Sequence, residues 1–285
     1  MKLGLLVSGG LGMEALKMIM SQLHPVFVFT NKTSTSIIEF CAKNNVQIFI
    51  GNPRNSSASE FLVDKHVELI LSINYLFLIE KDIVNFPSKY CINIHGSLLP
   101  KYRGRTPHVW SIINNEKFTG VTAHLIDENC DTGAIVKQER IEISYNDTGA
   151  SLLEKYSRVY LKMLTYLLNE VESDNLTAEL QDESKATYFH KRTPDDGEIN
   201  WGWQKERIRN WVRAQANPYP GAFTVLNDQR VIIDEIVYSD MGFKQDFPNG
   251  LVLGTSPVLV KTQNGVVELS KIREGKDLIV KGMVL

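Results

Sequence analysis

Residues 91–107 read CINIHGSLLPKYRGRTP, an apolar strand that runs into a loop with two prolines and two glycines. Asn93 and His95 lie two residues apart at the end of this strand, so their side chains point to the same side of a sheet. Ligands of open α/β sheets bind beyond the carboxyl ends of the strands. The pair is therefore a candidate site. On these two residues alone, an asparagine that caps a turn beside a hydrogen-bonded histidine is an equally good interpretation.

The first half of the chain alternates short apolar runs with helical patterns, which is typical of a parallel sheet with crossover helices. It predicts a Rossmann-like, doubly wound, mostly parallel sheet, an α/β fold. The expected strands are 2–8, 25–30, 47–50, 68–72 and 90–94, and the expected helices between them are 12–22, 36–44 and 57–66. A short helix at 107–115, strands at 120–126 and 135–143, and a long amphipathic helix at 148–172 follow.

The last third of the chain has a different pattern. A helix at 204–214 leads into short alternating strands, which predict a small antiparallel β-barrel of the open, OB-like kind. These strands are 222–226, 230–239, 250–254, 258–261 and 265–272. We therefore expect a catalytic domain at 1–185, a linker at 186–203 and the barrel at 204–285. Three tryptophans are expected to fasten the barrel to the first domain: Trp201, Trp203 and Trp211.

Composition excludes several classes of protein. Lys and Arg (31) nearly balance Asp and Glu (33), so the net charge is −2 and no basic field favours a nucleic acid as partner. No segment approaches the roughly 20 apolar residues that a membrane span needs. With three unclustered cysteines, Cys41, Cys91 and Cys130, expected to be buried and reduced, the sequence predicts a cytoplasmic protein.

A metal site is not expected, because the remaining histidines are scattered along the chain: His24, His66, His124 and His190. The opening turn SGGLG (8–12) lacks the full dinucleotide fingerprint, so an NAD site is not expected either.

Asp131 lies in a turn after the strand that follows Asn93 and His95. An amide donor, an imidazole and a carboxylate form a set suited to acyl transfer. The amide stabilises a tetrahedral oxyanion, the imidazole moves protons, and the carboxylate raises the basicity of the imidazole. No serine or cysteine nucleophile is needed if the acceptor is an amine.

Several blocks in fixed order resemble the folate-dependent formyltransferases. They are NIHGSLLPKYRG (93–104), TP (106–107), TGVTAHLID (119–127) and DTG (131–133), with the aspartate 36 residues after the histidine. Two later blocks, ATYFHKRTPDDGEINW (186–201) and VRAQANPYPGAFT (212–224), are similar to methionyl-tRNA formyltransferases and to formyltransferases of nucleotide-linked amino sugars.

The resemblance implies N10-formyltetrahydrofolate as formyl donor and a primary amine as acceptor. It assigns Asn93 to the formyl oxygen, His95 to the oxyanion and proton transfer, and Asp131 to the pairing of His95. Apolar walls for the flat pterin are expected from one set of residues, for each of which core packing is the alternative. This set is Tyr75, Leu76, Ile79, Leu98, Leu99, Leu125, Ile126 and Asp127.

The acceptor would border the glycine-rich opening turn and the loop after His95, where arginine suits a sugar or a diphosphate. These residues are Ser8, Gly9, Gly10, Arg103, Gly104, Thr106 and Pro107. The short connection between 25–30 and 36–44 leaves no room for the basic insertion of methionyl-tRNA formyltransferases. We therefore expect a UDP- or dTDP-linked amino sugar, of the kind used in bacterial surface polysaccharide. Methionyl-tRNA formylation and a non-catalytic folate- or sugar-binding protein are the alternatives, and a homodimer is left open.

Overall fold

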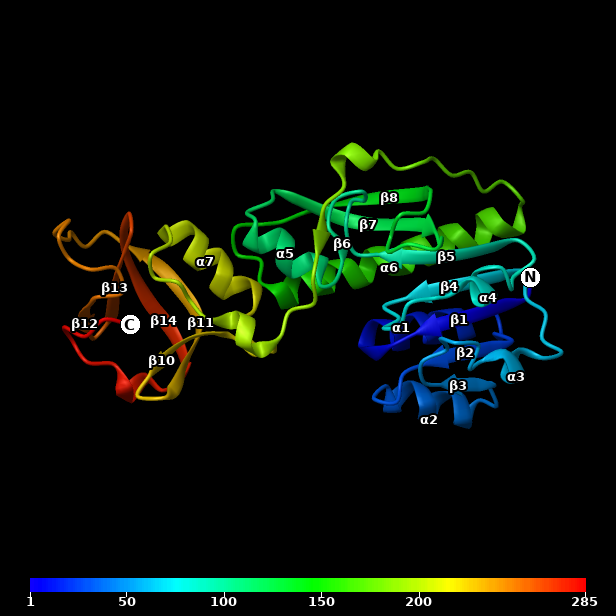
Figure 1. Ribbon diagram of the computed structural model, residues 1–285, viewed down its shortest axis with the longest axis horizontal. Coiled ribbons are helices and arrows are strands. Elements are labelled where there is room, and N and C mark those ends of the chain that lie inside the picture. The colour runs from blue at the N-terminus through cyan, green and yellow to red at the C-terminus, as the bar shows by residue number, and fades with distance from the viewer. The chain divides into compact units, whose positions relative to one another are not determined.

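A computed structural model describes residues 1–285 (Figure 1). The chain forms two compact units that interleave along the sequence. The first unit comprises Met1–Gly104, Gly120–Ile141 and Lys155–Tyr188, and the second comprises Arg105–Thr119, Glu142–Glu154 and Phe189–Leu285. The division at residues 185 and 203 stays a prediction, and the contacts add that two earlier segments group with the C-terminal part. None of the helices has the length and apolar character needed to cross a membrane.

A seven-stranded sheet with the order β3-β2-β1-β4-β5-β7-β8 forms the centre of the first unit (Figure 1). Its strands are β1 (Leu3–Val7), β2 (Phe27–Thr30), β3 (Ile48–Ile50), β4 (Leu69–Ile73), β5 (Tyr90–His95), β7 (Phe118–Leu125) and β8 (Ile135–Glu142). The pairs from β3 through β5 are parallel, whereas β7 runs antiparallel to β5. The predicted Rossmann-like, mostly parallel sheet is confirmed.

Helices lie on both faces of this sheet, which is why its central strands are continuous apolar runs. The helices are α1 (Gly9–Met20), α2 (Thr35–Lys43), α3 (Ser59–Leu62), α4 (Lys81–Val84) and α6 (Gly149–Glu172). Gly12 of α1 packs against Val7 on one face. Leu6 points to the other face, into an apolar cluster with Leu62 of α3 and Ile83 of α4.

The helices of the first unit differ from the expected ones at three places. α1 begins at Gly9 rather than at residue 12, because Gly9, with φ of +64°, turns the chain abruptly out of β1. α3 covers four residues instead of 57–66, and the chain soon adopts a left-handed conformation at Asp64, with φ of +61°. The single turn of α4 was not predicted.

The second unit contains a five-stranded antiparallel sheet with the order β10-β11-β14-β13-β12. Its strands are β10 (Ala222–Leu226), β11 (Gln229–Ser239), β12 (Val252–Thr255), β13 (Val258–Thr262) and β14 (Gly265–Glu274). The last three strands form a meander, and β11 lies beside β14, which is a Greek-key arrangement. The open antiparallel barrel is confirmed.

Two helices of the second unit pack against each other, α5 (Pro107–Ile113) and α7 (Lys205–Ala214). A two-stranded ribbon of β6 (Arg103–Gly104) and β9 (Tyr188–Phe189) lies where the units alternate along the chain. Three 3-10 turns complete the structure, at Glu183–Lys185, Pro194–Gly197 and Lys276–Leu278.

The tryptophans pack within the second unit itself, so the structure gives them a different role from the expected one. Trp201 is buried in the apolar cluster of the barrel, and Trp203 and Trp211 pack against that cluster. The guanidinium of Arg192 lies 4.3 Å from the ring centroid of Trp211 and 5.0 Å from that of Trp110. One cation thus joins α5 to α7 through two aromatic rings.

The cysteines agree with the expectation only in part. Cys41 and Cys91 are buried, and burial raises the pKa of both thiols, to about 11 and about 12. Cys130 is exposed, because it lies in the turn between β7 and β8. The prediction of a buried thiol is wrong at this position.

The stacked cation allows a test of the second unit. Arg192→Met should lower the free energy of unfolding by about 2 kcal/mol, because it removes two cation–π contacts and the hydrogen bonds to Asp196 and Gln215. Urea denaturation measures the change. The exposed neighbour Lys191 provides the control, since Lys191→Met should stay within about 0.5 kcal/mol of wild type. Equal effects of both substitutions would contradict the role of the stacked cation.

Candidate active site

A row of polar side chains crosses the sheet of the first unit. Ser72 of β4 pairs in register with Asn93 of β5, and Asn93 pairs in register with His124 of β7. Residues paired across neighbouring strands point to the same face of a sheet. His95 follows Asn93 by two residues and therefore shares this face. The carboxyl end of β5 thus presents an amide and two imidazoles together.

Asp131 completes the group from the loop between β7 and β8. One carboxylate oxygen, Oδ2, lies 3.6 Å from His95 Nδ1, and the other, Oδ1, lies 3.6 Å from His124 Nε2. The backbone N–H of Gly104 donates a hydrogen bond of 2.9 Å to Oδ2. The structure therefore brings Asn93, His95 and Asp131 together as the sequence predicts, while their chemical roles stay a prediction.

The orientation of His95 follows from its partners. Its Nε2 lies 2.9 Å from the carbonyl oxygen of Tyr102 and must donate, because a carbonyl can only accept. In the neutral ring the lone pair on Nδ1 then faces Asp131. A proton placed on Nδ1 would be stabilised by the carboxylate, in a site where only 8% of the His95 side chain is exposed.

His124 is a site residue that the sequence reasoning missed. Its Nδ1 donates a hydrogen bond of 2.8 Å to the carbonyl oxygen of Leu125, so Nε2 of the neutral ring is an acceptor. The amide nitrogen of Asn93 lies 3.1 Å from this Nε2 and donates to it. His124 therefore fixes which way the Asn93 amide points and leaves its second N–H for a ligand. The available signal was the polar residue in the strand TGVTAHLID, opposite Asn93.

Asp131 is an ionised group inside the protein. Burial raises its pKa, but His95, His124 and the N–H of Gly104 lower it by more. The pKa of Asp131 therefore lies well below its ordinary value, and the carboxylate stays ionised at neutral pH. A permanent negative charge faces both imidazoles.

The residues expected to form the folate pocket fall into two groups. Tyr75, Ile79 and Ile126 pack against the apolar cluster on the face that carries Asn93. Burial raises the pKa of the Tyr75 hydroxyl above its ordinary range. Leu76 is 40% exposed and remains accessible at the surface.

Other members of the expected folate set have structural partners. Leu98 packs closely over Gly120, and the N–H of Leu99 donates to the hydroxyl of Thr122. Leu125 pairs in register with Ile92, the residue before Asn93.

Asp127 shapes the turn that carries Asp131. Its Oδ1 accepts hydrogen bonds from the hydroxyl of Thr132, at 2.6 Å, and from the N–H of Asn129, at 3.1 Å. The Asp127 side chain is thus used within the protein.

The opening turn has polar groups without partners. The hydroxyl of Ser8 is buried and has no hydrogen-bond partner in the protein. Gly9 donates its N–H to the hydroxyl of Ser34, and a side chain at Gly10 would meet open space. An unpaired buried hydroxyl is costly unless a ligand or water satisfies it. This turn can therefore take a polar ligand.

The loop after His95 is used mainly to hold the site. Gly104, with φ of +100°, donates to Asp131. Pro107 is the first residue of α5, and Thr106 precedes it with a buried hydroxyl that has no partner. Arg103 is fully buried, and Gln181, Glu183 and Tyr188 take the hydrogen bonds of its guanidinium. The structure thus opposes the expected contact of Arg103 with the substrate, because its donors are already occupied.

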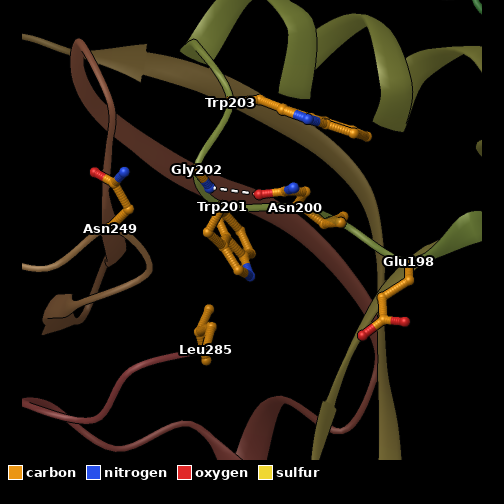
Figure 2. Close-up of a pocket in the computed structure, with 8 residues that line it drawn as sticks. Glu198, Asn200, Trp201, Gly202, Trp203, Asn249 and Leu285 are labelled. Carbon is orange, nitrogen blue, oxygen red and sulfur yellow. Dashed lines mark hydrogen bonds between the residues drawn. The ribbon is translucent and has the colours of Figure 1, made fainter.

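A surface hollow of about 570 Å³ lies in the second unit (Figure 2). Figure 2 shows the Trp201 ring between Leu285 and the strand that carries Asn200 and Gly202, whose side chain and N–H bond to each other. None of the residues predicted for catalysis or binding lines it. Its walls hold a single carboxylate, Glu198, and no histidine or cysteine. The hollow does not carry the chemistry of the polar row.

The charge of Asp131 gives a testable pH dependence. Its folded-state pKa lies below the unfolded value of about 3.9. Ionised Asp131 therefore stabilises the fold above that pH, and this contribution is lost as the pH falls through the folded-state pKa. In a ¹³C NMR titration of the carboxyl groups, Asp131 should titrate below its ordinary range, and His95→Gln should raise its pKa. His66→Gln, at an exposed histidine, should leave it unchanged. An ordinary pKa in the wild type would contradict the geometry.

Solved structures with the same fold are sugar-modifying enzymes. WlaRD, a sugar 3N-formyl transferase solved in the presence of dTDP and 5-N-formyl-THF, is 21% identical, with a TM-score of 0.72 over 95% of this chain and 98% of that one. The N-formyltransferase of Helicobacter canadensis, in complex with folinic acid and dTDP-3-aminofucose, is 19% identical, with a TM-score of 0.76 over 95% and 99%. A 4-N formyltransferase of Francisella tularensis is 22% identical, with a TM-score of 0.68 over 81% and 96%.

Two family models match the chain itself. The formyl transferase model matches residues 13–166, and the model of the formyl transferase C-terminal domain matches residues 191–282. The first match includes the whole polar row and Asp131. Since it spans more than half of the chain, the protein belongs to the formyl transferase family.

Proposed function

We propose that this formyltransferase moves a formyl group from N10-formyltetrahydrofolate to the primary amine of a UDP- or dTDP-linked amino sugar. The observation that carries the proposal is the convergence of Asn93, His95 and Asp131 at the end of β5. The ligands of similar structures support both substrates, since those proteins were solved with formylated folates and with dTDP or a dTDP-amino sugar.

The reaction defines what the site must do. The neutral amine nitrogen attacks the formyl carbon, and a negative charge develops on the formyl oxygen. The bond between the formyl carbon and N10 then breaks. One proton leaves the amine and one proton goes to N10, so no oxidant or metal is required. The site must therefore donate to an oxyanion and move one proton.

Asn93 and His95 fit the first task. The second N–H of Asn93, which His124 leaves free, would donate to the oxyanion. The His95 imidazole would stabilise the same charge and pass the proton, while ionised Asp131 stabilises positive charge on the ring. Because each group has a fixed partner, little reorganisation is needed when the charge develops.

The folate would lie against the apolar residues at the ends of β4 and β7. Tyr75, Ile79 and Ile126 already pack on one cluster, and Leu76 is accessible beside them. Flat aromatic ligands bind to such apolar walls, with few polar contacts for orientation. The remaining members of this proposed pocket are Leu98, Leu99, Leu125 and the backbone of Asp127.

The acceptor would lie at the opening turn. β1 precedes this turn and lies beside β4, which in turn pairs with β5, so the turn shares the carboxyl edge of the sheet with Asn93. The partnerless hydroxyl of Ser8 and the open space at Gly10 suit a polar sugar. The loop with Gly104, Thr106 and Pro107 is proposed to complete this side.

A sugar is favoured over tRNA by the connection after β2. This strand ends at Thr30 and α2 begins at Thr35, so four residues join them and no basic insertion is present. The net charge of −2 supports the same choice, because tRNA binding depends on cationic surfaces. The free cysteines support a reducing cytoplasmic location. A homodimer remains compatible with this proposal.

Direct assay of acceptors tests the proposed substrate. The protein and N10-formyltetrahydrofolate are incubated with a panel of UDP- and dTDP-amino sugars and, separately, with methionyl initiator tRNA. Mass spectrometry should find the mass of one formyl group added to at least one sugar nucleotide and none on the tRNA. Formylation of the tRNA alone would overturn the proposed acceptor. Binding of folate without any transfer would favour a non-catalytic role.

Substitutions in the polar group test the mechanism. His95→Ala and Asp131→Ala should each lower kcat by about 10²-fold or more, because each removes a group that acts in the transition state. Folate affinity, measured by calorimetry, should change little. His66→Ala, at an exposed histidine outside the site, should keep the wild-type rate. Wild-type rates in both site variants would contradict the assigned roles.

A further inference from the structure

The turn that carries Asp131 needs support from outside itself. Asp131 has φ of +58°, in the left-handed region, and a side chain at Gly133 would lie 1.8 Å from the carbonyl oxygen of Leu125. Left-handed residues other than glycine persist where the surrounding structure holds them. The contacts of this turn therefore decide where the Asp131 carboxylate points.

Gln181 holds this turn from a distant part of the first unit. After α6 the chain passes over β8 and comes down beside β6, and the side chain of Gln181 points back from this segment (Figure 1). Its Nε2 donates to the carbonyl oxygens of Asp131, at 2.9 Å, and of Gly133, at 2.7 Å. One amide thus binds the turn on both sides of Thr132.

Arg103 fixes the orientation of the Gln181 amide. The Nε and Nη2 of Arg103 donate to Oε1 of Gln181, at 3.2 and 2.7 Å. A guanidinium has only donors, so the oxygen of Gln181 must face it and the NH₂ group must face the turn. Glu183 accepts two further bonds and balances the buried cation.

The network closes on the reacting groups. Arg103 lies between Tyr102, whose carbonyl oxygen accepts from His95, and Gly104, whose N–H donates to the Asp131 carboxylate. The same residue therefore anchors the loop that holds both site side chains and, through Gln181, the backbone of Asp131.

We propose that Gln181 and Arg103 are positioning residues of the transfer reaction. Arg103 orients the Gln181 amide, and this amide keeps the Asp131 carboxylate beside Nδ1 of His95. The inference rests on the proposed function, because it assigns both residues to an action through Asp131. It gives Arg103 a role inside the protein in place of contact with the acceptor.

Gln181→Glu separates the two halves of the network. A carboxylate still accepts from Arg103, but it has no N–H for the carbonyl oxygens of Asp131 and Gly133 and repels them. We expect kcat to fall by about tenfold or more, the equivalent of about 1.4 kcal/mol, with the KM of both substrates changed by less than about twofold. Gln181→Met, which removes both halves, should cost at least as much. Glu179→Gln, on the same segment with an exposed side chain, is the matched control and should keep the wild-type rate.

Two further measurements distinguish positioning from a general structural role. In an Asp131→Asn background, Gln181→Glu should lower the residual kcat by less than about twofold, because a residue that acts through Asp131 has no effect once the carboxylate is gone. In the ¹³C titration, Gln181→Glu should raise the pKa of Asp131, since the carboxylate moves away from its partners.

The outcomes separate this inference from the function on which it rests. Wild-type activity of Gln181→Glu with an inactive Asp131→Asn would overturn the positioning role and leave the proposed function intact. Equal losses in both backgrounds would also overturn it, because Gln181 would then act independently of Asp131. Full activity of Asp131→Asn would contradict the catalytic role of Asp131 itself.

Discussion

The site is organised around one ionised carboxylate held largely out of water. Only 13% of the Asp131 side chain is exposed, so its negative charge is stabilised by the two imidazoles and the N–H of Gly104 rather than by solvent. A buried charge without such partners is strongly destabilising. Each partner therefore has to be in place: β5 supplies His95, β7 supplies His124, and the loop after β5 supplies Gly104.

The sheet topology provides these partners at low conformational cost. β5 is the last parallel strand, and the antiparallel β7 beside it places His124 directly opposite Asn93. The chain then returns through the turn with Asp131. Two hydrogen-bonded strands and one turn therefore define the geometry of the reacting groups, whereas the donor and acceptor sites use more variable loop residues.

The fold was predictable because hydrophobic period and length are local signals. β10 has the predicted bounds, and most other strands differ from the predicted ones by one or two residues at their ends. The catalytic set was predictable from its motif spacing. His124 was not identified, because its role depends on strand register, and a histidine considered alone shows no partner. Cys130 was assigned to the interior from composition, although the turn that carries it faces solvent.

Arg103 shows where sequence reasoning reaches its limit. An arginine in a loop rich in glycine and proline is typical of a solvated or ligand-binding group. Its partners lie about 80 residues later in the chain, and nothing in the local pattern links the two segments. The burial of the guanidinium follows from tertiary contacts alone. The same holds for Gln181, which lies in a polar stretch that predicts only a connecting loop.

The buried arginine also limits how the chain can be shortened for biophysical work. An expression fragment that stops at residue 185 would retain Gln181 and Glu183 but lose Thr187, which binds the backbone on both sides of the Tyr102–Arg103 peptide bond, and Tyr188. One that stops after α6 would leave the guanidinium in the protein interior without any counter-ion. Truncated versions of this unit should therefore extend at least through Tyr188.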